Sequence, residues 1–465
     1  MSYIRIRKHY LHVPYLALGL LEFLVLFLSF YVLSEIQQAL DLVPVSYSLW
    51  SSLLYASLLS AGSLAMGVYL AMMREGFAAM FFRTLVAFCF LGSLGLSVVT
   101  VIWPALDVGS SNLFWAVMIS TGITLLVRRA FVHLVDSDQL SRRILVLGTG
   151  QLAGQIHREY ERYRRSLGVR IVGYLGSEEE ALPAHACMPT PDDLFTFCKN
   201  NRISEIVVAT QERRRTEGAQ FPLDDLIRCK LGGVQISSAQ AFYERELNRI
   251  DLTLLQPSWI IFSDGFKASK ARDAIKRLFD LVVSVALAIL LAPIMLFVFA
   301  AVYLESGRPF VYSQIRTGQH GKPFKIYKVR SMRQDAEKDG KAVWAKAQDS
   351  RVTRVGAFIR NTRLDEIPQL YNVIRGDMSF VGPRPERPEF VVDLENSIPF
   401  YTHRHAVKPG LMGWAQLNYP YGASVEDARC KLEYDLYYAK NHSFVMDILI
   451  MIQTVEVVLL GKGVH

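Results

Sequence analysis

Two adjacent carboxylates, Asp365 and Glu366, stand beside Arg363 in the C-terminal part of the chain. Carboxylates act in enzymes as nucleophiles, as general bases and as contacts for a divalent cation. Neighbouring residues on a helix point about 100° apart, so a shared reaction centre requires a helix end or a metal that reaches one of the acids. An isolated Asp-Glu pair usually belongs to the solvated surface, so its meaning depends on the surrounding motifs.

Two further segments present basic side chains. Alternate residues of a strand share a face, so Lys328 and Arg330 in the segment Lys325–Met332 are expected to point together. The alternative is a solvated basic strand. In Gly382-Pro-Arg384-Pro385, the prolines on both sides fix the backbone around Arg384. A rigidly held guanidinium suits bidentate phosphate binding, and the alternative is a plain surface turn.

Four long motifs follow one another in this part of the chain: Phe324-Lys-Ile-Tyr-Lys-Val-Arg-Ser-Met332, Arg363-Leu-Asp-Glu-Ile-Pro-Gln369, Gly376-Asp-Met-Ser-Phe-Val-Gly-Pro-Arg-Pro385 and Lys408-Pro-Gly-Leu-Met-Gly-Trp-Ala-Gln416. In content and order they resemble the bacterial sugar transferases, also called polyprenyl-phosphate hexose-1-phosphate transferases or monotopic phosphoglycosyl transferases. The resemblance covers residues 270–465. The preceding part of the chain, with its apolar stretches and glycine turn, resembles the N-terminal part of the large members of this family. Those members include undecaprenyl-phosphate glucose and galactose phosphotransferases. Tyr419–Ser424 resembles the subgroup found in exopolysaccharide clusters.

The resemblance implies transfer of a hexose-1-phosphate from a UDP-sugar to undecaprenyl phosphate, with release of UMP. UDP-glucose is the first expected donor and UDP-galactose the second. It implies a catalytic pair in which Asp365 attacks the sugar-bearing phosphate and forms an aspartyl-phosphosugar intermediate. Mg²⁺ is expected beside this pair, with Asp365 or Glu366 as its protein contact. The candidates for binding the substrate phosphates are Arg363, Arg384, Lys328 and Arg330.

The first third of the chain is predicted to lie in a membrane. Hydrophobic residues make up 51% of the 465 residues, and the mean hydropathy is +0.22. Stretches long enough to cross about 30 Å of hydrocarbon are 13–33, 49–73, 81–103 and 113–132. Lys and Arg lie before the first span, at the loop after the second span and after the fourth span, whereas the other two loops have none. Because positive charge is retained in the cytoplasm, this predicts that the N-terminus and everything after the fourth span are cytoplasmic. A bundle of buried soluble helices would not explain this alternation. Glu22 in the first span is expected near an interface or paired with a neighbour.

The middle of the chain is predicted to form an α/β domain. An apolar strand, a glycine turn and a helix start follow at Arg142–Gly154, where Gly148, Gly150 and Ala153 form a GxGxxA pattern typical of a Rossmann-type first turn. Such glycines also occur wherever the backbone bends tightly, and we favour that structural role over a bound nucleotide. Further strand-like runs, which predict a parallel sheet, are 169–174, 206–209 and 234–236.

Another apolar stretch, Leu281–Tyr303, carries Pro293 at its centre. A proline inside a helix removes an N–H donor and clashes with the preceding turn, which favours a break or a sharp kink. Basic residues flank both ends, so a crossing helix would put one cluster on the wrong side. We expect a re-entrant helix at about 278–304 that keeps both flanks cytoplasmic, and the alternative is a kinked crossing helix. The apolar run Phe444–Leu460 is expected either at the interface or packed on the catalytic domain.

The sequence thus predicts a membrane protein of three parts: a bundle of four transmembrane helices (1–140), a middle Rossmann-like α/β domain (141–265), and a mixed α/β catalytic domain with a re-entrant helix (266–465). The expected location is the bacterial inner membrane, with the catalytic domain cytoplasmic. A homodimer is expected.

The composition limits the partners. The net charge of +8 suits contact with membrane lipids and phosphorylated substrates. The basic residues are dispersed and the sequence has no nucleic-acid-binding motif, which argues against nucleic acid as a partner. The five cysteines lack CxxC spacing and are expected to be free thiols. Two rival functions remain. One is a membrane-anchored nucleotide-sugar dehydratase or epimerase, which the absence of any Tyr-x-x-x-Lys disfavours. The other is a non-catalytic scaffold of a polysaccharide assembly complex.

Overall fold

The structure is a computed structural model that divides into two compact units, residues 1–239 and 240–465. Each unit is described by itself, and the predicted domain boundaries stay predictions. The description covers the whole chain except residues 1–2, 7–8, 41–47, 67, 70–75, 107–109, 135–141, 164–168, 177–181, 211–220, 256–268, 334–350, 421, 423 and 461–465.

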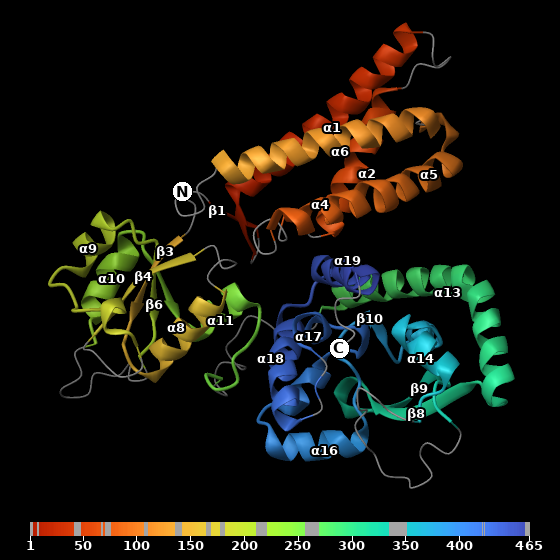
Figure 1. Cartoon of the computed structure of the whole chain (residues 1–465). Coiled ribbons are helices and arrows are strands. Elements are labelled where there is room, and N and C mark those ends of the chain that lie inside the picture. Colours follow the sequence, from red (N-terminus) through yellow and green to blue (C-terminus); the bar gives the residue numbers. More distant parts are fainter. Residues whose placement is uncertain are drawn as a thin grey trace. The chain divides into compact units, whose positions relative to one another are not determined.

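The N-terminal unit begins with an antiparallel hairpin of β1 (Tyr3–Ile6) and β2 (His9–His12). A bundle of apolar helices follows, and Figure 1 shows it in red to orange. Its members are α1 (Val13–Ala39), α2 (Leu49–Ala65), α4 (Gly76–Val86), α5 (Ser93–Ile102) and α6 (Ser110–Leu134), with a π-helical segment, Ala87–Gly92, between α4 and α5. Apolar side chains such as Phe30, Tyr55 and Phe88 fill the bundle core.

Four helical stretches are long and apolar enough to cross a membrane: Leu16–Ala39, Met80–Ile102, Asn112–Phe131 and Lys270–Ser306. The first three confirm the predictions at the first, third and fourth positions of the N-terminal region. The predicted second span is different, because its apolar helical part, Leu49–Leu64, is shorter. At 1.5 Å per residue, the 17 residues of α2 reach about 26 Å. Residue 67 and residues 70–73 of that prediction lie outside the described residues.

The carboxylate of Glu22 is paired deep inside this bundle. Its two oxygens accept hydrogen bonds from Arg128, from Nε at 2.7 Å and from Nη2 at 2.8 Å. Tyr69 donates to the same carboxylate at 2.6 Å, and Arg128 also donates to Thr84 at 2.5 Å. Glu22 is 2% exposed and Arg128 is fully buried. The prediction that Glu22 has a partner is confirmed, and the pair joins α1 to α6.

The rest of the N-terminal unit is an α/β domain around a five-stranded parallel sheet with the order β5-β4-β3-β6-β7. Each predicted strand is present. The strands are β3 (Arg142–Leu147), β4 (Val169–Leu175), β5 (Cys187–Met188), β6 (Glu205–Val208) and β7 (Gln235–Ser238). The helices between them are α8 (Gln151–Tyr163), α9 (Leu194–Asn200) and α10 (Leu223–Leu231). The sheet core consists of buried aliphatic residues such as Leu145 and Ile206.

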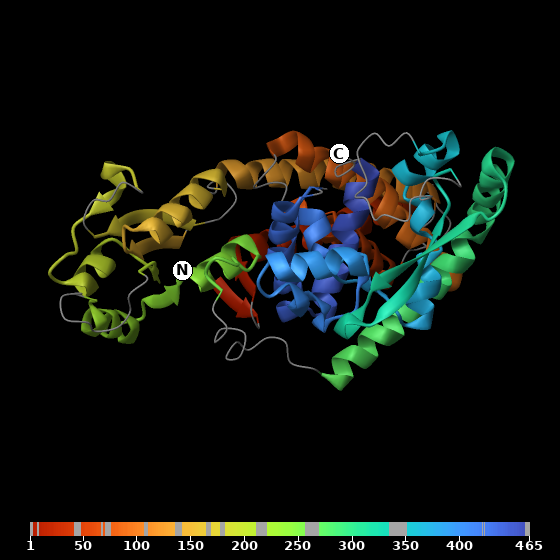
Figure 2. The same cartoon turned by 90° about the horizontal axis from the view of Figure 1, so that it is seen from below.

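The C-terminal unit combines one long apolar helix with short strands and helices. Figure 1 shows that the long helix, α13, bends sharply along its course, and the helix contains Pro293. The hairpin of β8 and β9 is seen along its length in Figure 2, in teal. The elements are α11 (Ala239–Leu247), α13 (Lys270–Ser306), β8 (Val311–Thr317), β9 (Pro323–Val329), α14 (Arg354–Asn361), η5 (Leu364–Glu366), α15 (Gln369–Arg375), β10 (Ser379–Val381), α16 (Pro388–Ser397), η6 (Tyr401–Ala406), β11 (Gly410–Met412), α17 (Trp414–Asn418), α18 (Val425–Asn441) and α19 (Phe444–Leu460).

Helix α19 packs on the rest of this unit. Ile450 is fully buried, and Met446 also belongs to the core of the unit. Asp447, an acidic residue within this apolar run, is 3% exposed. It pairs with Nζ of Lys276 at 2.6 Å and accepts the Tyr438 hydroxyl at 2.7 Å. Of the two expectations for this segment, the described side chains favour the packed helix.

Candidate active site

Asp365 and Glu366 lie on a single 3-10 turn, η5, between α14 and α15. The turn exists because Arg363 takes a left-handed backbone conformation, with φ of 58°, and redirects the chain after α14. The acids therefore sit at the end of a helical segment rather than in its middle. A helix end is one of the two arrangements that the sequence allows if both acids serve one centre, and a metal that reaches one acid is the other.

Glu366 is paired with two cations from different segments. Its Oε1 atom lies 3.1 Å from Nζ of Lys328 and 3.0 Å from Nη2 of Arg384. Burial alone would raise the pKa of this carboxyl, but the charges of Lys328, Arg384 and Arg363 outweigh it and hold the pKa well below its usual range. Burial lowers the pKa of Lys328, and the charge of Glu366 opposes that effect. Glu366 is thus a fixed negative charge that gathers Lys328 and Arg384 at one point.

Asp365 has a different environment, although it is the next residue. It is 8% exposed. Within the part of the chain that the structure describes, its carboxylate makes no hydrogen bond or ion pair. Burial raises its pKa, the charge of Glu366 adds to the rise, and nearby cations oppose it. A carboxylate that is buried but unpaired is suited to act as a nucleophile or to contact a metal.

The loop that carries Arg384 follows β10, and its backbone is fixed by contacts with the segment that leads into β11. The Gly410 N–H donates to the Pro383 carbonyl oxygen at 3.0 Å. A Cβ at Gly382 would lie 2.2 Å from the Lys408 carbonyl oxygen, so only glycine fits there. The Gly-Pro-Arg-Pro and Lys-Pro-Gly motifs are therefore two sides of one contact, which holds the backbone of Arg384 beside Glu366.

A buried pair that no sequence motif predicts supports this loop. Nη2 of Arg404 donates to the Arg384 carbonyl oxygen at 3.0 Å and to Oδ2 of Asp435 at 2.7 Å. The side chains of Arg404 and Asp435 are 5% and 3% exposed. Arg404 lies on η6 and Asp435 on α18, so no local pattern links them.

The two other predicted phosphate-binding residues are placed differently. Arg363 is exposed, and its charge contributes to the low pKa of Glu366. Arg330 is 8% exposed and donates to the carbonyl oxygens of Ser306, at 2.8 Å, and Gly307. It therefore closes the C-terminal end of α13, whereas Lys328 contacts Glu366. Lys328 and Arg330 therefore contact different partners. The role of Arg330 in phosphate binding stays a prediction.

A metal at this site would have few protein ligands. Among the described residues, no group of three or more His, Cys, Asp and Glu side chains is placed to hold an ion. Mg²⁺ in phosphate-handling sites commonly takes one or two carboxylates, with substrate phosphates and waters completing its shell. The unpaired carboxylate of Asp365 and the adjacent Glu366 supply that donor set, so these residues fit a magnesium ion that the substrate helps to hold.

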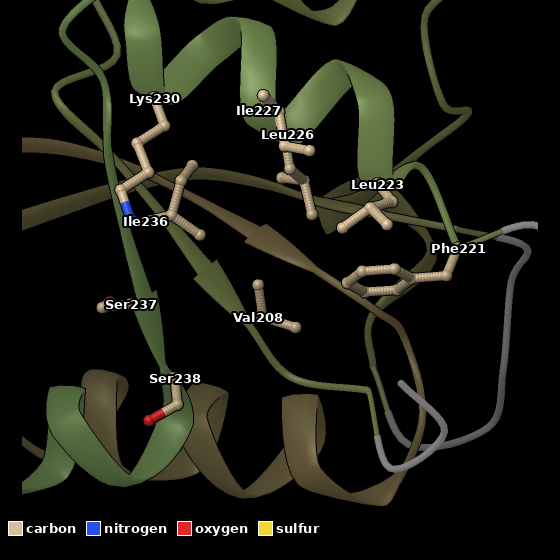
Figure 3. A pocket seen from close by; sticks show the side chains of 9 residues that line it. All are labelled: Val208, Phe221, Leu223, Leu226, Ile227, Lys230, Ile236, Ser237 and Ser238. Carbon is tan, nitrogen blue, oxygen red and sulfur yellow. The ribbon is translucent and has the colours of Figure 1, made fainter. Parts of the chain in front are cut away.

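The glycine turn of the α/β domain has a structural explanation. Gly148 has φ of +121°, and a Cβ there would lie 3.0 Å from the Ala209 carbonyl oxygen. Ala153 is fully buried on α8. Figure 3 shows a pocket in this domain, with a volume of about 300 Å³, lined by α10 and the ends of β6 and β7. Its lining is mainly apolar and includes none of the predicted turn residues Gly148, Gly150 and Ala153.

Comparisons with known proteins identify the family of the chain. Residues 271–461 match the model of the bacterial sugar transferase family. The chain is 40% identical to UDP-N-acetylgalactosamine-undecaprenyl-phosphate N-acetylgalactosaminephosphotransferase of Aeromonas hydrophila, over 51% of this chain and 55% of that protein, so it spans about half of that relative. It is 30% identical to UDP-glucose:undecaprenyl-phosphate glucose-1-phosphate transferase of Escherichia coli (strain K12), over 72% of each. It is 41% identical to an exopolysaccharide production protein of Rhizobium leguminosarum bv. phaseoli, over 41% of this chain and 98% of that protein.

The site and these matches together define a class of enzyme, the phosphoglycosyl transferases of membranes. Within that class, the chain belongs to the bacterial sugar transferase family. The resemblance noted in the sequence is thereby confirmed.

Proposed function

We propose that this protein transfers a hexose-1-phosphate from a UDP-sugar to undecaprenyl phosphate and releases UMP, as the first step of exopolysaccharide or O-antigen assembly. The observation that carries the proposal is that the two neighbouring acids have different environments. Asp365 is unpaired and buried, while Glu366 is held by Lys328 and Arg384. A reaction at a diphosphate needs both a nucleophile and fixed positive charge, and this turn brings them together.

In the proposed first step, a carboxylate oxygen of Asp365 attacks the phosphorus that bears the sugar. The new bond forms between that oxygen and phosphorus, the bond from phosphorus to the bridging oxygen breaks, and UMP leaves with the electron pair. Arg384, Lys328 and Arg363 stabilise the charge on the phosphate oxygens. In the second step, a phosphate oxygen of undecaprenyl phosphate attacks the same phosphorus and frees the carboxylate of Asp365. The lipid then carries the sugar on a diphosphate.

Mg²⁺ belongs to this proposal, with Asp365 or Glu366 as its protein contact. When bound, the ion neutralises charge on the diphosphate and orients it. The chain itself contributes the positions of the two carboxylates and of the cations that back them. Lys328, Arg384 and Arg363 outnumber the two carboxylates of Asp365 and Glu366, so the site keeps a net positive charge that favours a phosphorylated substrate.

The sugar is proposed to be glucose, with galactose as the second choice. The names of the relatives divide between donors: the Escherichia coli relative is named for UDP-glucose, and the Aeromonas relative for UDP-N-acetylgalactosamine. The Escherichia coli match extends over 72% of each chain, which supports glucose as the first donor to test.

Release of UMP tests the function directly. The purified full chain, with undecaprenyl phosphate and Mg²⁺, is expected to release UMP from UDP-glucose faster than from UDP-galactose or UDP-N-acetylgalactosamine. A different preferred donor would correct the sugar only. Absence of UMP from every donor would favour the scaffold, and a bound nicotinamide absorbance would favour the dehydratase or epimerase.

The path of α13 is proposed to be re-entrant, with both of its ends on the cytoplasmic side of the bacterial inner membrane. Contacts at both ends support this path. Near its start, Arg277 donates to the carbonyl oxygens of Val373 and Ile374, each at 2.6 Å. At its end, Ser306 accepts from Arg330 at 2.8 Å. A straight crossing would separate the two flanks by about 30 Å of hydrocarbon, yet one compact unit binds both. Pro293 and the bend in Figure 1 supply the turn.

Cysteine labelling tests this path. Lys270 and Lys322 are exposed residues on either side of α13. In a chain without its five native cysteines, Lys270→Cys and Lys322→Cys are each expected to react with a membrane-impermeant thiol reagent only from the cytoplasmic side. Reaction of the two from opposite sides would mean that α13 crosses the membrane.

The middle domain is proposed to be Rossmann-like. Support comes from the order of its strands: numbered along the chain from β3, the sheet reads 3-2-1-4-5, as in the doubly wound nucleotide-binding folds. The backbone conformation and close packing of Gly148 explain the glycine there without a bound ligand. The homodimer expected from the sequence remains a prediction.

A further inference from the structure

Gln369 carries a buried donor that no described residue of the protein accepts. The side chain is 3% exposed, and its Nε2 atom is buried without a hydrogen-bond partner among the described residues. Buried side-chain donors are almost always paired, because an unpaired one loses its hydration without compensation. A buried amide that breaks this rule next to a reaction centre marks a place where something else accepts the hydrogen bond.

The backbone places Gln369 beside the catalytic pair. The helical path continues from η5 into α15, since the Leu370 N–H donates to the Ile367 carbonyl oxygen at 3.0 Å. This bond joins residues three apart, as in a 3-10 helix, where residues i and i+3 share a face, so Gln369 follows Glu366 on the same side. Two contacts to strand β9 bracket it: Glu366 meets Lys328 before it, and Asn372 bonds to the backbone of β9 after it.

Asn372 shows what a purely structural amide looks like at this position. It is fully buried, one helical turn beyond Gln369. Its Nδ2 donates to the Lys325 carbonyl oxygen at 2.6 Å, and its Oδ1 accepts the Tyr327 N–H at 3.2 Å. Both ends of this amide are used to fasten α15 to β9. Gln369 lies on the same helix and makes no such use of its Nε2.

We propose that Gln369 contacts substrate, and that its Nε2 group donates to a phosphate oxygen held in front of Asp365. This inference rests on the proposed function. The shared chemistry is a phosphate oxygen, which either the UDP-sugar or the lipid phosphate supplies. A hydrogen bond from a neutral donor to a charged oxygen, made only when substrate is bound, explains why the donor is buried and unpaired in the protein alone.

The test compares Gln369→Met with Asn372→Leu in the full chain. Methionine has nearly the same length and flexibility as glutamine but no donor. Gln369→Met is expected to unfold at the wild-type temperature or above it, while transfer falls about 10- to 100-fold, as for a lost bond to a charged group. Asn372→Leu is expected to lower the unfolding temperature, because it removes two bonds to β9. An unfolding temperature for Gln369→Met as low as that of Asn372→Leu, or unchanged transfer by folded Gln369→Met, would overturn the proposal.

The half-reactions identify which phosphate is bound. A loss already present in single-turnover UMP release without acceptor assigns the contact to the UDP-sugar, and a loss that appears only on adding undecaprenyl phosphate assigns it to the lipid. Either result supports the contact. Failure of the proposed function is distinguishable, because the wild-type chain would then release no UMP at all. An active wild type with an equally active Gln369→Met would remove only the role of Gln369.

Discussion

Replacement of Asp365 by asparagine is expected to lower UMP release and sugar transfer by at least about 1,000-fold, as for loss of a nucleophile in covalent catalysis. The amide has the shape of the carboxylate but cannot form the bond to phosphorus. With UDP-sugar and no acceptor, the wild-type protein should gain the mass of a hexose phosphate, and Asp365→Asn should gain none. Substantial turnover by the variant, or a mass adduct on it, would remove Asp365 from the nucleophile role.

Unfolding temperatures supply the control for this variant. The carboxylate of Asp365 is buried without a partner among the described residues, so the fold gains nothing from its charge, and Asp365→Asn should be at least as stable as the wild type in EDTA. Glu366→Gln removes the charge that holds Lys328 and Arg384 at 3.1 and 3.0 Å, and should unfold at a lower temperature. The reverse order of stabilities would mean that the two acids have been assigned the wrong way round.

The candidate acidic pair and the fixed loop of Arg384 could be predicted because each lies in a short motif whose chemistry is local. Prolines beside Arg384 and adjacent acids at Asp365 are visible in a few consecutive letters. The partner of Arg330 could not be predicted in this way, because it is the carbonyl oxygen of Ser306, 24 positions earlier in the chain. Its contact with Ser306 depends on where α13 ends, which composition does not specify.

In the N-terminal unit, the partners of buried polar residues and the ends of helices could not be predicted from the sequence. The sequence indicated that Glu22 would have a partner or lie at an interface, but Arg128 is 106 positions away. The apolar run of the second predicted span continued past the end of α2, because hydropathy does not mark where a helix stops. By contrast, the parallel sheet was predictable from its apolar runs, since buried parallel strands are apolar on both faces.

The pair of Arg404 and Asp435 is the contact with the largest expected effect on stability. Arg404 donates to Oδ2 of Asp435 from Nε at 3.0 Å and from Nη2 at 2.7 Å, and to the Tyr401 hydroxyl at 2.9 Å. Arg404→Met leaves the carboxylate of Asp435 buried and uncompensated. Breaking one side of such a pair costs about 3–5 kcal/mol. We expect a clear fall in the unfolding temperature of Arg404→Met, together with a loss of transfer, and an unfolding temperature equal to that of the wild type would contradict the buried pair.

A double variant separates stability from positioning. Arg404→Met combined with Asp435→Leu removes both charges, so most of the lost stability should return, as when a buried ion pair is replaced by apolar residues. Transfer should nevertheless stay low, because the Arg384 carbonyl oxygen still lacks the donor that lies 3.0 Å from it. The remaining defect should appear with the UDP-sugar in single-turnover UMP release, since Arg384 faces the diphosphate in the proposed first step. If the double variant recovered wild-type transfer as well as stability, Arg404 would act only in folding, and the contacts of Gly382 and Gly410 would be sufficient to hold Arg384.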